Sequence, residues 1–292
     1  MNKDFNKGLF SAGLGSFWWG FFGVIYFKYT TYIGYVELIV HRCLWTTFTL
    51  ILTTFFFSKW NIFFNIIQKK TNLFYLFISG LLILINWSVW IFAIATNQII
   101  DASFGYFIMP ILSVMFGFIF FREKLNKKRI FSIFLVAISI IYLIAANLKT
   151  LPWTGIILAF DWAIYNVVRK KINLDTDIGL LIESFFILPI ALIAFYFIVI
   201  NGHNDFTLSD PLMMFFIFLA GPMTVIPLFL YVRGVELCGL GPAGMIFYIT
   251  PTFQFLLGYF YYNEPFSIEK LVGFIIIWIA VVIYLKDLYE NN

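Results

Sequence analysis

Residues 102–123 read ASFGYFIMPILSVMFGFIFFRE, and residues 243–264 read AGMIFYITPTFQFLLGYFYYNE. The two stretches lie 141 residues apart and share identical residues at several positions: Ala102 with Ala243, Pro110 with Pro251, Gly117 with Gly258, and Glu123 with Glu264. A gap-free match that includes a proline, a glycine and a glutamate indicates an internal repeat. In the same register Arg42 falls opposite Glu183, although identities outside the two stretches are sparse.

The composition excludes a water-soluble fold. Of the 292 residues, 62% are hydrophobic and only 12% are charged, whereas soluble domains carry about 25% charged residues. At a mean hydropathy of +0.93, the apolar side chains cannot all be hidden in one core, so the solvent must be lipid. The net charge of +4 forms no basic patch for nucleic acid, and the two cysteines lie in apolar stretches without a redox motif.

Ten apolar runs are long enough to cross a bilayer, whose core of about 30 Å needs about 20 residues per helix. They cover approximately 8–27, 33–57, 72–95, 101–121, 130–146, 152–168, 178–200, 212–232, 240–262 and 267–285. Ten spans put both termini on one side of the membrane. Fifteen Lys and Arg residues fall on that side, three fall on the other, and Arg42 lies within a span. The positive-inside rule then predicts cytoplasmic termini.

The repeat divides the ten spans into two units of five, residues 1–146 and 147–292, with a linker at 147–152. Because five is an odd number, the second unit must enter the membrane upside down relative to the first. Inverted repeats of this kind are typical of carriers, whose central site opens to either side in turn. The predicted fold class is an all-α membrane protein with ten transmembrane helices in two inverted five-helix repeats.

Five ionisable side chains lie well within the apolar runs: Glu37, His41, Arg42, Asp161 and Glu183. Each charged group at a helix centre opposes insertion by about 2.5–3.5 kcal/mol, so these groups must face protein or water. Helical geometry places Glu37 and His41 on one face and turns Arg42 away from them. We expect Arg42 to find its partner on another helix, with Glu183 as the first candidate and Asp161 as the second. The cluster either binds a polar part of a substrate or a coupled proton, or is a buried ion pair that locks the helices together.

Small, aromatic and polar residues share one helix face in each half. The spacing aligns Tyr106, Pro110 and Ser113 in one run, and Pro251 and Gln254 in its counterpart. A proline leaves the carbonyl four residues earlier without its helical donor, and in a membrane that carbonyl needs another partner. We expect both stripes to line a cavity, with the prolines as points of bending and gating. Helix packing through the small residues is the alternative.

Other polar residues at helical spacing are further candidates. Asn86 and Trp90 lie four residues apart in the run at 72–95 and are expected to line the same cavity. Glu123 and Glu264 end their runs just before the next helix, where a carboxylate stabilises the coming N-terminus.

Signatures of catalysis are missing from the sequence. With two histidines, one of them in a predicted outer loop, no HExxH or other histidine-rich metal site is possible. No GxSxG, Walker loop or GxGxxG after a strand occurs. We therefore expect no enzyme, no ATP-driven transport within this chain, and no metal or nucleotide cofactor.

Seven segments carry a family resemblance: FWWGFFGVIYFK at 17–28, ELIVHRCLW at 37–45, NWSVWIFA at 86–93, ASFGYFIMP at 102–110, VRKK at 168–171, LLIES at 180–184 and YITP at 248–251. In this order and at this spacing the chain resembles the RarD-type branch of the EamA family, in the drug/metabolite transporter superfamily. The resemblance implies a ten-helix carrier in a bacterial cytoplasmic membrane that moves small organic solutes by alternating access. That superfamily often closes the fourth and ninth helices with Gly-Glu, whereas this chain has Arg122-Glu123 and Asn263-Glu264.

We predict a secondary transporter of a small organic metabolite or drug-like solute, with a proton or another ion as the candidate coupled species. Arg42 is expected to hold an anionic group or anchor a gate, and Glu183 and Glu37 to balance its charge or carry protons. Two other functions stay open. A membrane-embedded enzyme would use His41, Glu37 and Asp161 for acid–base chemistry on a lipid-linked substrate, and a structural membrane protein would use the buried charges for packing alone.

Overall fold

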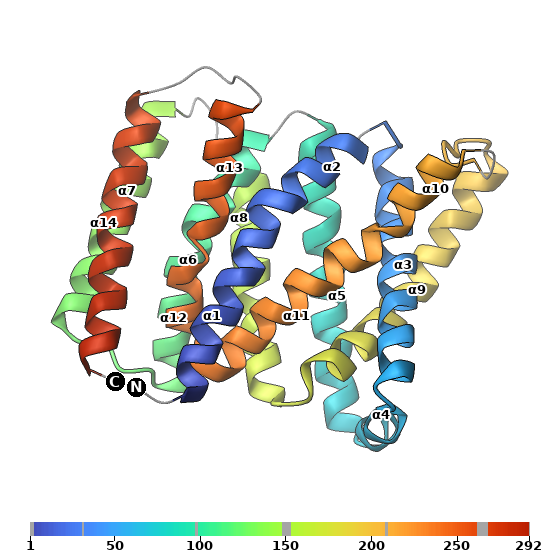
Figure 1. Cartoon of the computed structure of the whole chain (residues 1–292), viewed down its shortest axis with the longest axis horizontal. Coiled ribbons are helices and arrows are strands. Elements are labelled where there is room, and N and C mark those ends of the chain that lie inside the picture. The colour runs from blue at the N-terminus through green and yellow to red at the C-terminus, as the bar shows by residue number, and fades with distance from the viewer. Residues whose placement is uncertain are drawn as a thin grey trace.

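The computed structural model of the chain describes residues 3–30, 32–96, 99–147, 153–207, 210–261 and 268–291. Within these residues every regular element is a helix, as the apolar runs predict (Figure 1). The elements are α1 (Lys3–Trp18), the π-helical turn η1 (Trp19–Gly23), α2 (Val24–Thr30), α3 (Tyr35–Phe56), α4 (Trp60–Ile67), α5 (Lys70–Ala95), α6 (Ile99–Phe121), α7 (Lys127–Asn147), α8 (Trp153–Ile172), α9 (Thr176–Ile200), α10 (Pro211–Phe218), α11 (Ala220–Cys238), α12 (Leu240–Ile246), α13 (Ile249–Phe260) and α14 (Ile268–Asn291).

Seven helical segments are long and apolar enough to cross a membrane: Lys3–Phe27, Tyr35–Phe56, Lys70–Ala93, Lys127–Ala145, Thr176–Ile200, Pro211–Cys238 and Leu271–Glu290. Three of the ten predicted spans fall short by that measure. Where its side chains are described, α6 is apolar over the shorter stretch Gly105–Phe121. α8 ends in three basic residues, and the run at 240–262 is divided between α12 and α13. Ten spans therefore stay a prediction.

A glycine separates α11 from α12. Gly239 has a φ of +99°, in the left-handed region that favours glycine. A Cβ at this position would also lie 2.7 Å from Glu123 Oε1, so a larger residue would displace that carboxylate. The break lets the chain reverse direction and brings α12 against α6.

The helices pack in a small number of extensive contacts. α1 lies against α11, α8 lies against both α5 and α6, α3 lies against α9, and α7 lies against α14. Small residues permit the closest approach: a Cβ on Gly15 would lie 2.8 Å from the Pro227 carbonyl oxygen, and one on Gly234 would lie 2.6 Å from Ala12 Cβ. Such contacts supply the van der Waals packing that holds helices together in lipid.

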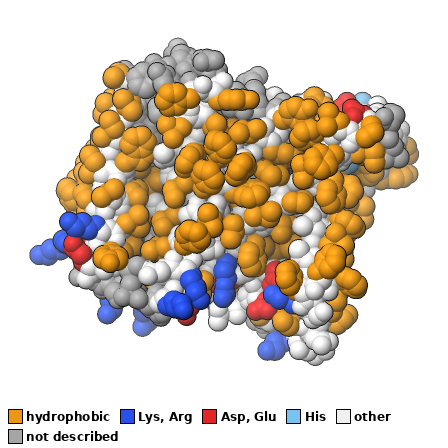
Figure 2. Space-filling model, viewed as in Figure 1, with side chains coloured by type: hydrophobic (Ala, Val, Ile, Leu, Met, Phe, Trp, Pro, Cys, Tyr) orange, Lys and Arg blue, Asp and Glu red, His pale blue; other side chains and the backbone are white. Residues whose placement is uncertain are grey.

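Charge and apolar surface are separated along the molecule. Both termini lie at one end (Figure 1), and Lys and Arg side chains gather along that end of the face in Figure 2, beside a broad hydrophobic band. Many large apolar side chains are exposed, among them Phe56, Phe134, Ile141 and Val282. An apolar surface of this extent fits lipid and would be a liability in water.

Some predicted features lie outside the described residues. These are the linker at 148–152 and the whole of Glu264 and its neighbours at 262–267, together with the side chains of Ala102 and Gly258.

Candidate functional site

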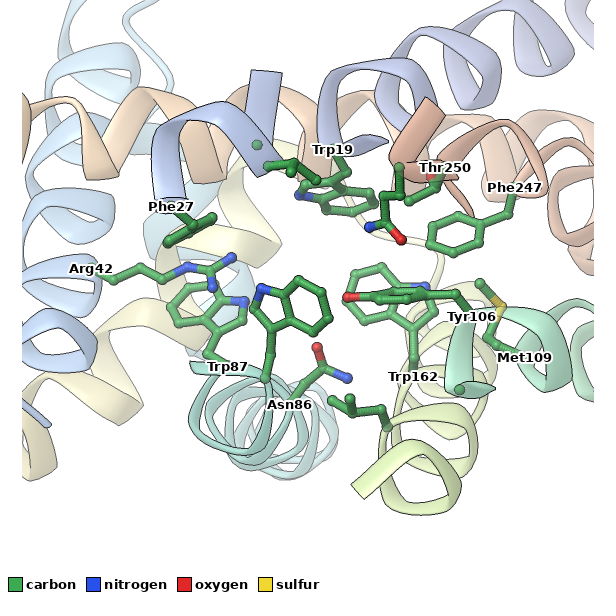
Figure 3. A pocket seen from close by; sticks show the side chains of 16 residues that line it. Trp19, Phe27, Arg42, Asn86, Trp87, Tyr106, Met109, Trp162, Phe247 and Thr250 are labelled. Carbon is green, nitrogen blue, oxygen red and sulfur yellow. The ribbon is translucent and has the colours of Figure 1, made fainter. Parts of the chain in front are cut away.

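A cavity lies where helices from both halves of the chain meet (Figure 3). It offers about 60 Å³ to the centres of water-sized molecules, which is room for several waters or one small solute. Its described lining comes from η1, α2, α3, α5, α6, α8 and the α12–α13 segment: Trp19, Gly23, Val24, Phe27, Arg42, Asn86, Trp87, Trp90, Gly105, Tyr106, Met109, Leu158, Trp162, Phe247, Thr250 and Gln254.

The π-helical turn η1 forms one wall of the cavity. Single π turns inside α-helices occur often at functional sites, and this one carries Trp19 and Gly23 into the lining. Thr250 Oγ1 donates a hydrogen bond of 2.8 Å to the Ser16 carbonyl oxygen. Gly20 permits this approach, because a Cβ there would lie 2.7 Å from the Thr250 carbonyl oxygen. The first helix is thus fixed to α13 at the level of the cavity.

Arg42 is the basic residue of the described lining, and only 5% of it is exposed. Its Nε donates a hydrogen bond of 3.0 Å to Thr224 Oγ1. The guanidinium carbon lies 4.5 Å from the centroid of the Trp87 ring and 4.9 Å from that of Phe27. Nη1 is buried and has no hydrogen-bond partner among the described residues. Figure 3 shows the guanidinium reaching from α3 toward the cavity between the two rings.

The structure brings half of the ten predicted binding residues to this cavity: Arg42, Asn86, Trp90, Tyr106 and Gln254. Trp90 and Tyr106 meet edge to face, with ring centroids 5.2 Å apart. Asp161 lies behind the lining and is hydrogen-bonded to the Asn86 side chain, while its Oδ2 is buried without a partner among the described residues. Asp161 is therefore outside the described lining but linked to one of its residues, Asn86.

The predicted pairing of Arg42 with Glu183 or Asp161 is wrong. Among the described residues neither acid lies within 4.0 Å of its guanidinium nitrogens. Glu183 instead lies 3.4 Å from Arg169 Nη1 and accepts a hydrogen bond of 2.6 Å from Ser79 Oγ. Arg42 and Glu183 lie at different depths along the molecule. α3 and α9 run in opposite directions (Figure 1), and both residues are near the start of their helices, so Glu183 lies toward the end with the termini and Arg42 toward the other end.

Arg169 belongs to a larger buried ionic cluster at the end with the termini. Its Nη2 lies 3.9 Å from Glu236 Oε1 and donates a hydrogen bond of 3.2 Å to the Thr176 carbonyl oxygen. Thr176 Oγ1 donates a hydrogen bond of 2.6 Å to Glu236 Oε2, and Arg233 Nη1 lies 3.3 Å from the same oxygen. The sequence does not reveal this cluster, because Arg169 and its neighbours follow an apolar run and resemble a solvated helix end.

Glu123 stabilises a helix N-terminus, but not that of the helix that follows it. Its carboxylate accepts hydrogen bonds from the backbone nitrogens of Leu240 (2.7 Å) and Gly241 (2.9 Å), at the start of α12. Lys170 Nζ lies 2.7 Å from Glu123 Oε1. The expectation for the next helix is wrong, because the chain reverses directly after α6 and turns Glu123 back toward the other half.

Glu37 and His41 lie at the opposite end and are absent from the described cavity lining. His41 Nε2 lies 3.6 Å from Glu37 Oε1, as the four-residue spacing predicts. Glu37 also accepts hydrogen bonds from the backbone nitrogens of Asp205 (2.6 Å) and Phe206 (3.2 Å). The Asp205 side chain in turn accepts a hydrogen bond of 2.7 Å from the Gly34 backbone nitrogen. These bonds hold the segment before α10 against the start of α3.

Ser113, expected to line the cavity, packs between helices instead. Its Oγ donates a hydrogen bond of 3.1 Å to Met109 Sδ within α6, and a Cβ on Gly244 would lie 2.6 Å from Ser113 Cβ. The packing alternative therefore describes this residue. Pro110 lies inside α6 and Pro251 lies in the first turn of α13; each is next to a lining residue but outside the described lining.

Trp19 and Trp162 line the cavity although the sequence analysis did not select them. Their rings meet at 80°, with centroids 5.3 Å apart. Trp162 directly follows Asp161, so a buried acid beside a tryptophan was the available signal. The placement of Trp19 depends on the π turn, which regular helical spacing does not reveal.

Comparison with known proteins decides the family. The pattern of the EamA-like transporter family matches residues 6–145 and again residues 152–286. This chain belongs to the EamA-like transporter family. It is 32% identical over 287 residues to the uncharacterized transporter YojE of Bacillus subtilis (strain 168), over 97% of this chain and 95% of that protein. It is 30% identical over 285 residues to protein RarD of Escherichia coli (strain K12), over 98% and 96% of the two chains.

These relatives confirm a RarD-type member of the EamA family in the drug/metabolite transporter superfamily. A solved crystal structure shares the fold at a TM-score of 0.69 and 11% identity, covering 95% of this chain and 98% of that one. The family and its apolar helices indicate an integral inner membrane protein that transports a small molecule. The names of the relatives indicate transport rather than catalysis.

Proposed function

We propose that this protein is a secondary transporter that moves a small organic solute across the bacterial cytoplasmic membrane by alternating access, without ATP. The observation that carries the proposal is the cavity between the halves. Helices from both halves line it, and it contains one buried cation and two side-chain amides, those of Asn86 and Gln254. Small-molecule sites are mostly apolar with a few well-placed polar groups, and carriers bind solute between their repeats.

The fold we propose has ten spans in two inverted five-helix units, 1–146 and 147–292. Helix contacts support this because they repeat when the halves are exchanged at the offset of 141 residues. α1 packs on α11 as its counterpart α8 packs on α5, whereas α3 with α9 and α7 with α14 are pairs of counterparts. A pseudo-two-fold axis produces such a pattern.

Counterpart residues also touch beside the cavity, which supports an axis through this region. The rings of Tyr106 and Phe247 have centroids 5.7 Å apart, and Tyr248 donates a hydrogen bond of 2.8 Å to the Phe107 carbonyl oxygen. Each pair is separated by 141 residues. Residues related by a two-fold axis can touch only close to that axis, so either half can rock against the other around the cavity.

In this proposal the two ends of the molecule are closed by different polar groups. The end with the termini is cytoplasmic, since basic residues are retained there, and the cluster around Arg169 and Glu183 closes it. Glu37 and His41 close the outer end through the segment before α10. Pro110 and Pro251 are the points at which α6 and α13 bend when the closed end changes.

Side-specific labelling of a single cysteine tests alternating access. Cys43 and Cys238 are buried and unpaired, and both are replaced by alanine before Gln254→Cys is introduced. A membrane-impermeant maleimide should label Gln254→Cys from either side of the membrane, in right-side-out and in inverted vesicles. Labelling from one side alone, or from neither, would contradict a carrier and favour a structural membrane protein.

Two exposed positions provide matched controls. Lys128 is exposed at the end with the termini, and Lys128→Cys should be labelled only from the cytoplasmic side. Phe134, 59% exposed on the apolar flank of α7, faces lipid in this proposal, and Phe134→Cys should be labelled from neither side.

A further inference from the structure

We infer that the cavity takes a monocarboxylate whose body is a flat, apolar group such as an aromatic ring. The inference rests on the proposed function and names the substrate class of that site. The juxtaposition that leads to it is a buried, unneutralised Arg42 beside a group of aromatic rings.

Arg42 requires an anion. No carboxylate oxygen lies within 4.0 Å of it in the described part of the chain, and the titratable side chains that interact with it are Cys43, Tyr106 and Tyr26. A buried charge is unfavourable unless it is paired and hydrogen-bonded. Its Nη1 has no protein partner among the described residues, so a ligand oxygen in the cavity can accept that hydrogen bond and neutralise the charge.

The walls beyond Arg42 are aromatic. Trp90 lies edge to face on Tyr106, Tyr106 lies 5.7 Å from Phe247, and Trp19 lies 5.3 Å from Trp162, measured between ring centroids. In Figure 3 the labelled rings of Trp19, Tyr106, Trp162 and Phe247 lie together on the side of the cavity toward which the Arg42 side chain points. Aromatic faces favour stacked or edge-to-face contact with another ring, so the walls select a flat apolar body.

The other polar groups set the net charge of the ligand. Among the polar groups of the described lining, Asn86 and Gln254 are neutral, and Asp161 lies outside that lining. One cation balances one negative charge, which favours a carboxylate over a phosphate dianion. The described lining contains no acid to pair with an amine. A quaternary ammonium in an aromatic cage is the competing occupant, and the charge of Arg42 opposes it.

Binding of four compounds to the purified protein in detergent, measured by tryptophan fluorescence and thermal stabilisation, tests the inference. Phenylacetate has both features, phenylacetamide lacks the charge, butyrate lacks the ring, and phenyltrimethylammonium reverses the charge. We expect phenylacetate to bind at least tenfold more tightly than each of the other three. Arg42→Gln should remove this preference for the anion, and Arg42→Lys should retain part of it. Lys128→Gln, which removes a cation that is 60% exposed and absent from the described cavity lining, should leave it unchanged.

Equal or tighter binding of the amide or the ammonium compound would overturn the inference, as would absence of phenylacetate binding by protein that elutes as a single folded species. Retention of the anion preference in Arg42→Gln would overturn it as well. The proposed function fails separately, in the labelling of Gln254→Cys. Anion-selective binding with one-sided labelling would preserve the site and reject the carrier, and two-sided labelling with no selectivity would do the reverse.

Discussion

Removing the positive charge of Arg169 should lower the stability of the protein more than removing a charge from a partly exposed ion pair such as Lys59–Asp177. The Arg169 and Glu183 side chains are 1% and 2% exposed, and Glu236 is 6% exposed. Arg169→Met leaves Glu183 buried with only the hydroxyl groups of Ser79 and Tyr165 as partners. Breaking a buried pair from one side costs about 3–5 kcal/mol, because the remaining charge stays desolvated. We expect the free energy of unfolding to fall by that amount.

A second substitution separates lost charge balance from lost packing. In the double variant Arg169→Met, Glu183→Gln the uncompensated carboxylate is gone, so most of the lost stability should return. Two apolar or neutral groups in place of a buried ion pair are often close to neutral. The coupling energy between the two substitutions should therefore be at least about 2 kcal/mol.

The assay is reversible unfolding in mixed micelles, followed by tryptophan fluorescence, for both single variants and the double variant. Lys59→Met is the matched control, because Lys59 pairs with Asp177 at 2.6 Å but its side chain is 32% exposed. A pair of that exposure contributes about 0–1 kcal/mol. If Arg169→Met costs no more than Lys59→Met, or if the double variant is as unstable as the two single losses added together, the cluster does not lock this end of the molecule.

Three further predictions concern a close helix contact, a strained backbone position and a buried hydrogen bond. Gly15→Ala should lower stability by about 1–3 kcal/mol, because its Cβ would lie 2.8 Å from the Pro227 carbonyl oxygen and force α1 away from α11. Gly13→Ala is the control and should be tolerated, because the nearest contact of its Cβ would be 3.6 Å. Equal losses of stability for the two variants in thermal unfolding would refute the close contact at Gly15. Arg122 has a φ of +54°, a strained backbone conformation for a residue with a side chain, at a position where the superfamily often has glycine. Arg122→Gly should therefore raise stability by about 1 kcal/mol. A lower unfolding midpoint in the same assay would show that glycine does not relieve this strain. Tyr248→Phe should lower stability by about 1 kcal/mol, because the hydrogen bond to the Phe107 carbonyl oxygen is lost. A loss below about 0.3 kcal/mol in denaturant titration would show that this hydrogen bond does not join α6 to the α12–α13 segment.

The sequence predicted the helices well because membrane insertion imposes a simple rule on composition. Within the described residues each apolar run corresponds mainly to helical structure, and the basic end is visible as an excess of Lys and Arg. Arg42 could also be selected from the sequence, since a charge in an apolar run must face protein or water. What each buried charge faces is a separate question that the runs do not answer.

The partner of Arg42 could not be predicted from the repeat. Matching Arg42 to Glu183 identified counterparts, but counterparts on antiparallel helices lie at opposite depths unless they are close to the axis. Glu183 therefore pairs with Arg169 near the other end. Tyr106 and Phe247 are counterparts that do touch, with ring centroids 5.7 Å apart, and in the proposed inverted fold they lie close to the axis.

Local backbone geometry accounts for the remaining differences. The π turn that moves Trp19 into the cavity breaks the regular spacing on which stripe analysis depends. The stripe with Ser113 follows helical spacing, yet close approach of α12 at Gly244 converts that part of it from cavity wall to helix contact. Helix periodicity predicts which residues share a face, whereas the distance to the neighbouring helix decides whether that face is open or packed.

The most direct test of the account is the orientation of the two halves. α3 and α9 are counterparts, and an exposed residue follows each of them: Asn61, in the short helix α4 that follows α3, and His203, three residues after the end of α9. In the background without Cys43 and Cys238, Asn61→Cys should react with an impermeant maleimide only from the cytoplasmic side, and His203→Cys only from the outer side. Labelling of both cysteines from the same side of the membrane would contradict inverted halves and, with them, a cavity that opens to each side in turn.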